Sequence, residues 1–444
     1  MRGYWRFLQS EAPVLSYGIL LTFVASFGQT FFISLFVPSI LADLGLTSAA
    51  FGGIYSAATL TSALLLPLVG GWIDRYRLTP YTLAVLAGLA ASSLLLAGAW
   101  NLWILAVALL GLRITGQGLS PHTGLTTVAR HLNEVRGKAL SVASLGFPLG
   151  EAVLPLLVVA FLGFASWRMG WVLVAGAVAG LFLPAVLLAL GRAGLRVGPK
   201  ERSKTPSGGA STPSGDESQA EGTAGPFPEK EDGSSNGTSR ESTNPALGQW
   251  RRGDVLRDPR FWLVLPAAVL PPFWTTGLIL YQGALAQAKG WTLALMASGF
   301  LAFASCRVLF SLLVGPGIDR WSARALFPLA VLPMGAGIAA LALFDGRWAA
   351  FVYLGLLGTS LGVGGNLKTA LWAELYGVRH LGAIKSLDGS LMVLSTAAAP
   401  LLVGGLVEDP DAVPGLLWSA VASVVLGALL AYRGIRRSPV TREA

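Results

Sequence analysis

The sequence is poor in cysteine, histidine and charge. It has one cysteine, Cys306, and three histidines in 444 residues, which excludes an intrachain disulfide and a cysteine-built metal site. Only 12% of the residues are charged, about half the share typical of a soluble domain. No Gly-x-x-x-x-Gly-Lys-Ser/Thr run is present, so no ATP site is predicted. We therefore expect no metal, no cofactor and no enzymatic activity.

What the chain has in abundance is long apolar stretches. Hydrophobic residues make up 53% of it, and about 20 apolar residues suffice for a helix to cross a bilayer. We predict an all-α membrane protein with twelve transmembrane helices, at residues 12–38, 50–73, 79–98, 101–126, 137–163, 168–190, 260–287, 293–317, 324–344, 348–374, 382–406 and 413–433.

The chain carries one short phrase twice, 245 residues apart. The copies read Gly-Gly-Trp-Ile-Asp-Arg from Gly70 to Arg75 and Gly-Pro-Gly-Ile-Asp-Arg from Gly315 to Arg320. Such a repeat predicts two pseudo-symmetric six-helix halves, residues 1–191 and 260–444. Between them, 192–259 is predicted to be a disordered cytoplasmic linker, because 196–250 is rich in Gly, Ser, Thr, Pro and Glu. We interpret it as a tether rather than a docking module.

The basic residues predict the orientation. If the N-terminus is cytoplasmic, the outer loops contain only Arg168, Lys289 and Arg347 as cations, as the positive-inside rule requires. We predict a multi-pass protein of the inner or plasma membrane with both termini cytoplasmic. We also predict a monomer that contacts lipid and not nucleic acid, because basic residues at the membrane edges account for the net charge of +9.

The repeated phrase resembles the loop motif of the major facilitator superfamily, Gly-x-x-x-Asp-Arg-x-Gly-Arg-Arg or Lys. The first copy matches it at Gly70, Asp74 and Arg75 and departs from it at residues 77–79; the second matches at Gly315, Asp319, Arg320 and Arg324. The resemblance implies a twelve-helix carrier that works by alternating access. It also implies that Asp74, through contact with the other half, helps to hold one face closed.

Two arginines add to the resemblance. Arg113, followed by Gly116 and Gly118, is similar to the motif of the family's fourth helix. Arg307 in the eighth helix is similar to the arginine that monocarboxylate and oxalate/formate carriers use to bind carboxylate. We predict that Arg307 binds the substrate with Arg113 assisting; the alternative for Arg307 is a structural pair with an acid such as Asp388.

Charged groups inside the spans need a partner, a wet cavity or a function. Arg113 and Glu151 are predicted at similar depth on adjacent helices. Three alternatives stay open: a structural ion pair, a pair broken by a proton or substrate, and an unpaired Glu151 suited to proton coupling. Lys368 is expected to reach the headgroups by snorkelling. The candidates for carrying a coupled proton are Glu151, Asp388 and His122.

Polar and aromatic residues at mid-span are the remaining candidates for solute contact, with helix packing as the alternative for each. They are Gln29, Thr30, Trp274, Thr275, Tyr281 and Asn366. Together these features favour a secondary transporter of a small organic, monocarboxylate-like anion, with H⁺ as a coupling ion. Two alternatives are an exporter of amphipathic drugs that uses Glu151 and Trp274, and a transporter-like sensor that signals through residues 196–250.

Overall fold

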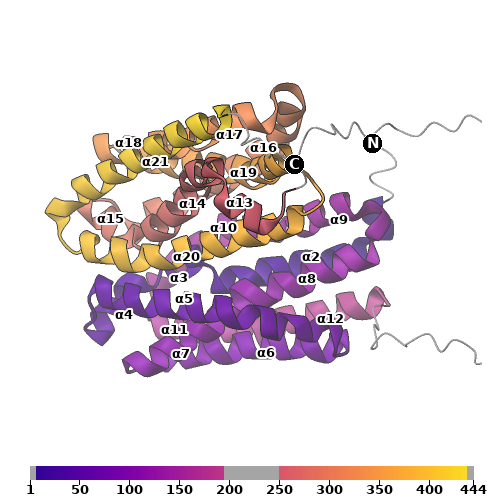
Figure 1. Ribbon diagram of the computed structural model, residues 1–444. Coiled ribbons are helices and arrows are strands. Elements are labelled where there is room, and N and C mark those ends of the chain that lie inside the picture. The colour runs from indigo at the N-terminus through magenta and orange to yellow at the C-terminus, as the bar shows by residue number, and fades with distance from the viewer. Residues whose placement is uncertain (1–6, 195–249, 438–444) are drawn as a thin grey trace, which may run out of the picture.

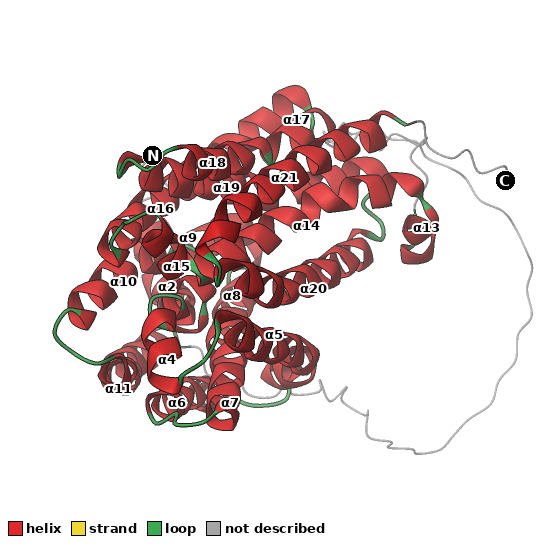
Figure 2. Ribbon diagram, turned by 90° about the vertical axis from the view of Figure 1, so that its left-hand side faces the viewer, coloured by secondary structure: helices red, strands yellow, loops and turns green. Residues whose placement is uncertain are grey.

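The computed structural model describes residues 7–194 and 250–437, and within these ranges every regular element is a helix. Eleven helices are long and apolar enough to cross a membrane, and a shorter apolar helix, Ala12–Gly28, belongs to the first span. Figure 2 shows the bundle seen along its helices. The predicted all-α membrane protein with twelve spans is confirmed for the described part of the chain.

The first half contains six spans, several of them built from more than one helical piece. In chain order the elements are α2 (Ala12–Val24), η1 (Ala25–Gly28), α3 (Thr30–Ile33), α4 (Val37–Leu44), α5 (Ser48–Gly70), η2 (Gly71–Asp74), α6 (Leu78–Ala97), α7 (Leu102–Leu112), the π-helix η3 (Arg113–Leu119), α8 (Ser120–His131), η4 (Asn133–Val135), α9 (Arg136–Ala143), α10 (Gly146–Leu162), α11 (Trp167–Ala177), the π-helix η5 (Val178–Phe182) and α12 (Leu183–Arg192).

Helix starts in this half follow from capping residues. The side chains of Thr47, Asn101 and Ser166 each accept a hydrogen bond from a backbone N–H of the first turn of α5, α7 and α11. These N–H groups have no partner inside the helix, so a hydroxyl or amide oxygen at this position fixes where the helix begins.

The second half repeats the plan with longer uninterrupted helices. Its elements are α14 (Pro259–Leu280), α15 (Gln282–Ala288), α16 (Leu293–Trp321), α17 (Ala323–Ala330), α18 (Leu332–Leu343), α19 (Trp348–Tyr376), α20 (Leu381–Val407), η6 (Pro410–Ala412) and α21 (Val413–Arg436).

The predicted linker is partly wrong. A short helix, α13 (Arg252–Arg257), lies inside the segment 192–259. It is ordered because Arg260 forms an ion pair with Asp258 at 2.8 Å and lies over the rings of Trp250 and Tyr376, which fixes the chain entering α14. Most of the predicted linker, residues 195–249, lies outside the described residues.

The first span, predicted as one helix over 12–38, is broken in its middle. Gln29 has an extended backbone (φ −81°, ψ 152°) between η1 and α3. The break follows from packing: Gly28 lies directly on the backbone of residues 112–117, where an added Cβ would collide with Leu112 and Gln117. The chain therefore turns here to continue along its neighbour.

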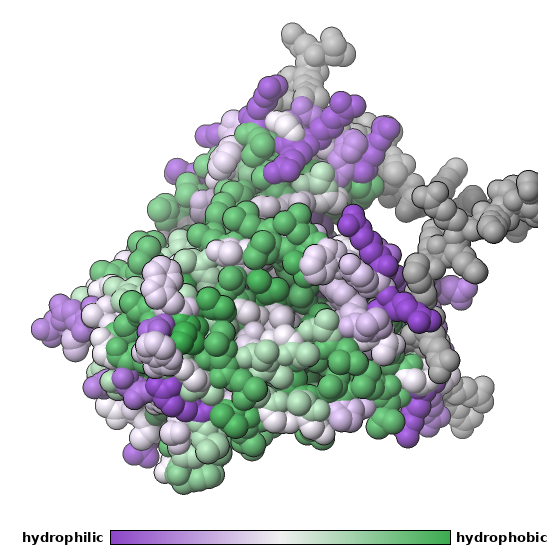
Figure 3. Space-filling view, turned by 90° about the horizontal axis from the view of Figure 1, so that it is seen from below, coloured by the Kyte–Doolittle hydropathy of each residue, from purple (hydrophilic) through white to green (hydrophobic). Residues whose placement is uncertain are grey.

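The two halves lie side by side, the first half in indigo to magenta and the second in orange to yellow (Figure 1). Helix α5 packs on α20, and α10 packs on α16, across the interface. Hydrophobic side chains cover the middle of the face in Figure 3, with hydrophilic ones toward its edges, as expected of a surface in lipid. We call the end of the bundle with Arg75, Arg130 and Arg320 the basic end, and the other the opposite end.

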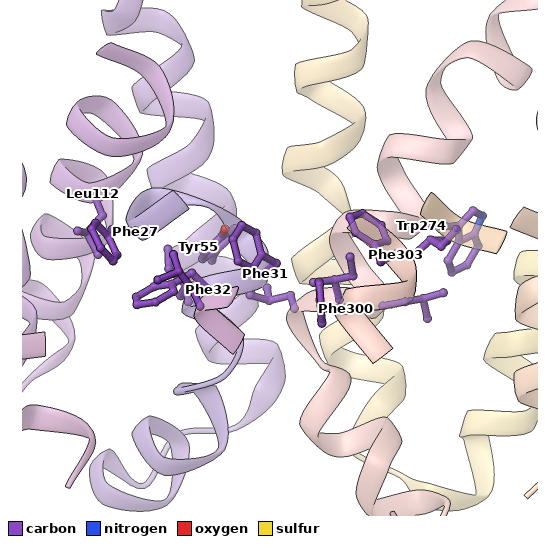
Figure 4. Close-up of a cluster of buried hydrophobic side chains, with 14 of the residues drawn as sticks. Phe27, Phe31, Phe32, Tyr55, Leu112, Trp274, Phe300 and Phe303 are labelled. Carbon is purple, nitrogen blue, oxygen red and sulfur yellow. The ribbon is translucent and has the colours of Figure 1, made fainter. Parts of the chain in front are cut away.

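At the opposite end the halves are sealed together. The Tyr281 hydroxyl, at the end of α14, lies 2.8 Å from the Ser48 carbonyl and 2.9 Å from the Pro400 carbonyl. Close by, Gln282 Nε2 donates to Ser34 Oγ at 2.7 Å. The α5–α20 crossing is tight because both helices present glycine there: a Cβ at Gly52 or Gly404 would collide with the Tyr281 hydroxyl. Phe31 faces Phe300 across the same interface, with ring centroids 5.8 Å apart (Figure 4).

Removing the Tyr281 hydroxyl should loosen this seal. Tyr281→Phe removes the one O–H that the Ser48 and Pro400 carbonyls share, at a cost of about 1 kcal/mol, which corresponds to roughly a fivefold shift toward the open seal. Faster amide hydrogen exchange over residues 45–52 and 281–288 is expected. Tyr353→Phe is the matched control, because the buried Tyr353 hydroxyl has no hydrogen-bond partner. Equal exchange in the two variants would contradict the role of Tyr281.

Candidate functional site

A cavity of about 600 Å³ lies between the halves and opens at the basic end. Its walls come from α3, α5, η3 and α8 in the first half and from α14 and α20 in the second. The lining includes Thr30, Thr59, Ser62, Leu66, Pro67, Arg113, Gln117, His122, Pro272, Thr276, Met392, Val393 and Thr396, with Gly70, Asp74 and Arg130 at the mouth. Hydroxyls, one buried arginine and apolar side chains thus share a single space.

Arg113 is the charged group at the inner end of this cavity. The residue is 4% exposed. Its Nη1 donates to the Tyr55 hydroxyl at 3.0 Å and lies 3.5 Å from Thr30 Oγ1, and the guanidinium lies 5.0 Å from the centre of the Tyr55 ring. Its Nε is buried without a hydrogen-bond partner, and no carboxylate of the described chain forms an ion pair with it. A buried cation without a counter-ion therefore borders the cavity.

Two irregular backbone segments meet behind Arg113. The π-helix η3 begins at this residue, and the break at Gln29 lies beside it, because Gly28 and Gly116 bring η1 and η3 into backbone contact. Wide helical turns and broken helices are frequent where membrane proteins bind ligands, because they re-aim side chains and free backbone groups. Neither irregularity was predicted from the sequence.

Arg307 has a partner that the sequence did not predict. It forms an ion pair with Glu151, so the pair joins α16 of the second half to α10 of the first. Arg307 is absent from the cavity lining, and Glu151 Oε2 is buried without a hydrogen-bond partner. Whether Glu151 pairs with Arg113 was left open by the sequence; in the structure it does not, because α10 presents Glu151 to the opposing half rather than to η3. The alternative of Asp388 as the partner of Arg307 is wrong.

Lys368 does not reach the headgroups. Its Nζ lies 2.8 Å from Asp388 Oδ2, and the two side chains are 16% and 8% exposed. Helices α19 and α20 place both groups at the same level, so an internal ion pair replaces the predicted snorkelling. Asp388 is therefore a partner of Lys368 within the second half, and its Oδ1 is buried without a hydrogen bond.

Comparison with known proteins gives a family. The family model described as Major Facilitator Superfamily matches residues 18–306. The chain belongs to the Major Facilitator Superfamily. As a member of it, the protein is a multi-pass membrane transporter of a small-molecule substrate.

Solved structures show the same fold at low sequence identity. The nucleoside transporter NupG superposes with a TM-score of 0.69 at 10% identity, over 96% of this chain and 100% of that one. A bacterial homologue of the human lysosomal transporter Spinster, inward-facing and occupied, gives 0.66 at 16% identity over 97% and 99% of the two chains. Its inward-facing, unoccupied form gives 0.61 at 16% identity over 96% and 97%. A search of curated proteins gives no match.

The superfamily loop motif lies at the cavity mouth. Asp74 forms an ion pair with Arg130 of its own half, not with the second half as the resemblance implied. The cavity between the halves opens at this end, with Asp74 in its lining. His122 lies against Gly70, since a Cβ on that glycine would be 3.6 Å from His122 Nε2. In the second copy, Arg320 lies over the ring of Trp321, and Asp319 has no ion pair within the described chain.

Several predicted solute contacts lie elsewhere in this superfamily fold. Trp274 donates to Ser423 Oγ at 2.8 Å and lies on the far side of α14 from Phe31 (Figure 4). Tyr281 belongs to the seal. Thr275 is absent from the cavity lining, whereas its neighbour Thr276 lines it. Asn366 is exposed and lies 3.4 Å from the Ser311 carbonyl. Of the mid-span candidates, only Thr30 borders the cavity.

The cavity-lining residues that the sequence did not predict lie on one face of their helices. Thr59, Ser62 and Leu66 recur on one face of α5, and Met392, Val393 and Thr396 on one face of α20. Their spacing of three to four residues was the sequence signal that places them on a common face. In a span that is apolar on every side, such spacing does not say which face meets the cavity.

Losing one partner of the Arg307–Glu151 ion pair should destabilise the protein more than losing both. Glu151→Ala leaves Arg307 without its counter-ion, and about 3 kcal/mol of stability should be lost, the low end of the range for buried pairs because the Arg307 side chain is 34% exposed. The double variant Glu151→Ala/Arg307→Ala should recover part of this loss. Thermal unfolding of detergent-purified protein measures both. Lys289→Met is the control, since its partner Asp345 is 82% exposed and little change is expected. A double variant less stable than either single variant would contradict the coupling.

Proposed function

We propose that this transporter carries a small organic anion by alternating access, with the anion bound by Arg113. The observation that carries the proposal is the buried guanidinium at the inner end of the cavity without a carboxylate partner. Burying a charge without compensation costs several kcal/mol. A negatively charged substrate would supply the missing compensation.

The chemistry of arginine fits this role. Its planar guanidinium offers paired donors that match a carboxylate, and it stays protonated when buried. Nη1 is already oriented by Tyr55, while Nε has no partner. The other charges bordering the cavity, Asp74 and Arg130, neutralise one another at the mouth. Arg113 is thus the uncompensated charge of the cavity, and Arg307, the anchor expected from the sequence, is occupied by Glu151.

We further propose that H⁺ is cotransported through Glu151. The pair with Arg307 crosses between the halves, so a proton on the carboxylate would cancel the attraction that links α10 to α16. The elements packed on α10 are α2, η1, α3, α11 and α16. Their other charged groups are Arg168, paired with Asp43, and Asp319 and Arg320 at the far end of α16; the titratable Tyr17 bonds Thr82. Arg307 is therefore the charge that decides the protonation of Glu151.

The orientation completes the proposal. We place the basic end in the cytoplasm, as the positive-inside rule favours. With the seal at the opposite end, the cavity is then open to the cytoplasm, and the protein lies in the inner or plasma membrane with both termini cytoplasmic. An exporter of amphipathic drugs is less well supported, because it would need an accessible acid in an aromatic cavity. Glu151 is paired, and Trp274 bonds Ser423.

Replacing Arg113 by lysine should weaken anion binding at least tenfold. Lysine keeps the charge but loses the planar fork, and a charge-assisted hydrogen bond contributes about 1.5–3 kcal/mol. Calorimetric titration of purified protein with benzoate, and with neutral benzamide for comparison, measures the effect. Arg433→Lys, on the exposed end of α21, should bind as the unmodified protein does. Benzamide binding as tightly as benzoate, or an unaffected Arg113→Lys, would refute the assignment.

Glu151→Gln should abolish proton-driven accumulation of substrate while retaining the exchange of substrate across the membrane. Glutamine keeps a hydrogen-bond acceptor for Arg307 but carries no titratable proton. In proteoliposomes, unmodified protein should accumulate benzenesulfonate under an inward proton gradient. This probe stays ionised, so a pH gradient does not accumulate it by passive diffusion. The variant should still exchange internal for external probe but show no accumulation. Accumulation by Glu151→Gln equal to that of unmodified protein would exclude Glu151 as the coupling group.

A further inference from the structure

A second, smaller cavity lies behind the first. It has a volume of about 160 Å³ and lies within the second half, between α14, α17, α19 and α20. Pro272 and Met392 line this side chamber and also line the central cavity. The two spaces are therefore neighbours, separated by these two side chains.

Met392 is the movable part of that partition. Proline is rigid, whereas methionine is unbranched and has three rotatable bonds, so it adapts readily to its surroundings. Its Sδ lies 3.9 Å from Lys368 Nζ, which also borders the chamber. On the far wall Gly364 and Gly365 leave room, since a Cβ on either would meet nothing within 4 Å.

The side chamber offers no free charge. Lys368 is bound to Asp388 at 2.8 Å. The other lining side chains are apolar apart from Ser360, whose hydroxyl donates to the Ala330 carbonyl and accepts from the Met334 N–H. Such a space suits an apolar group and gives no anchor for a second acid.

The central cavity itself has one polar end and apolar walls. Arg113 and Thr30 lie at the inner end, whereas Leu66, Pro272 and Val393 contribute to the walls. A volume of about 600 Å³ is within the range of pockets that hold drug-sized ligands. An acid of two or three carbons would engage Arg113 and leave most of these walls uncovered.

We propose that the substrate is an amphipathic monoanion whose acidic group binds Arg113 and whose apolar body lies against α14 and α20, and that Met392 limits its length by closing the side chamber. This inference rests on the proposed function and narrows its substrate class. Each methylene transferred from water to the cavity wall should tighten binding about fourfold. The gain stops when the chain meets Met392.

Calorimetric titration with linear carboxylates of two to eight carbons tests the proposal. With unmodified protein, affinity should rise with each carbon and then level off. Met392→Ala joins the two cavities, so its affinity should continue to rise for longer acids. Leu394→Ala is the matched control: this side chain is on the exposed face of α20 and lines neither cavity, so its plateau should stay at the chain length found for unmodified protein.

The outcomes distinguish this inference from the proposed function. Tighter binding of acetate than of hexanoate would overturn the amphipathic class and leave an anion transporter in place. The same plateau in Met392→Ala as in unmodified protein, with Leu394→Ala also unchanged, would overturn the role of Met392. Equal binding of the carboxylates and their neutral amides would overturn the proposed function itself.

Discussion

Charge in hydrocarbon is the constraint on which this structure depends. Each ionised side chain at mid-membrane costs several kcal/mol unless it finds a counter-ion, water or hydrogen bonds. Two ion pairs compensate such charges here, Arg307 with Glu151 and Lys368 with Asp388. At Arg113 it provides two hydroxyls and an aromatic ring but no acid. Arg113 lies at the inner end of a cavity between the halves, which is why we propose it as the group that binds an anion.

The same interface explains how the halves can move. At the opposite end they touch through backbone, since glycines at 52 and 404 let α5 and α20 approach closely around Tyr281. At the basic end they are apart, and Asp74 is bound within its own half. Between these levels the Arg307–Glu151 pair joins the halves. A seal of hydrogen bonds that each contribute about 1 kcal/mol is compatible with opening.

The superfamily fold positions the site by departing from regular helix. The break at Gln29 and the π-turn that begins at Arg113 lie in contact, and both depend on glycine, at 28 and 116. The second half supplies the other wall with nearly continuous helices, α14 and α20. The pseudo-symmetry of the sequence is therefore not carried into the cavity: the first half contributes the buried charge and the irregular backbone, and both halves contribute apolar and hydroxyl side chains to the wall.

The sequence by itself determined the number and order of the spans, because length and apolarity suffice to define a helix in lipid. It also carried the family resemblance, and counting residues along a helix of known rise predicted that Arg113, Glu151 and Arg307 lie at similar depth. The same counting placed Lys368 at the headgroups, whereas the structure pairs it with Asp388. The sequence did not determine how each helix is rotated about its own axis. A step of one residue turns a side chain by about 100°, so Thr275 and Thr276, alike in sequence, have different surroundings. The sequence also did not determine which charges form pairs, because Glu151 is predicted at similar depth to both Arg113 and Arg307. The packing of α10 on α16 decides that Glu151 pairs with Arg307, which leaves Arg113 without a carboxylate partner.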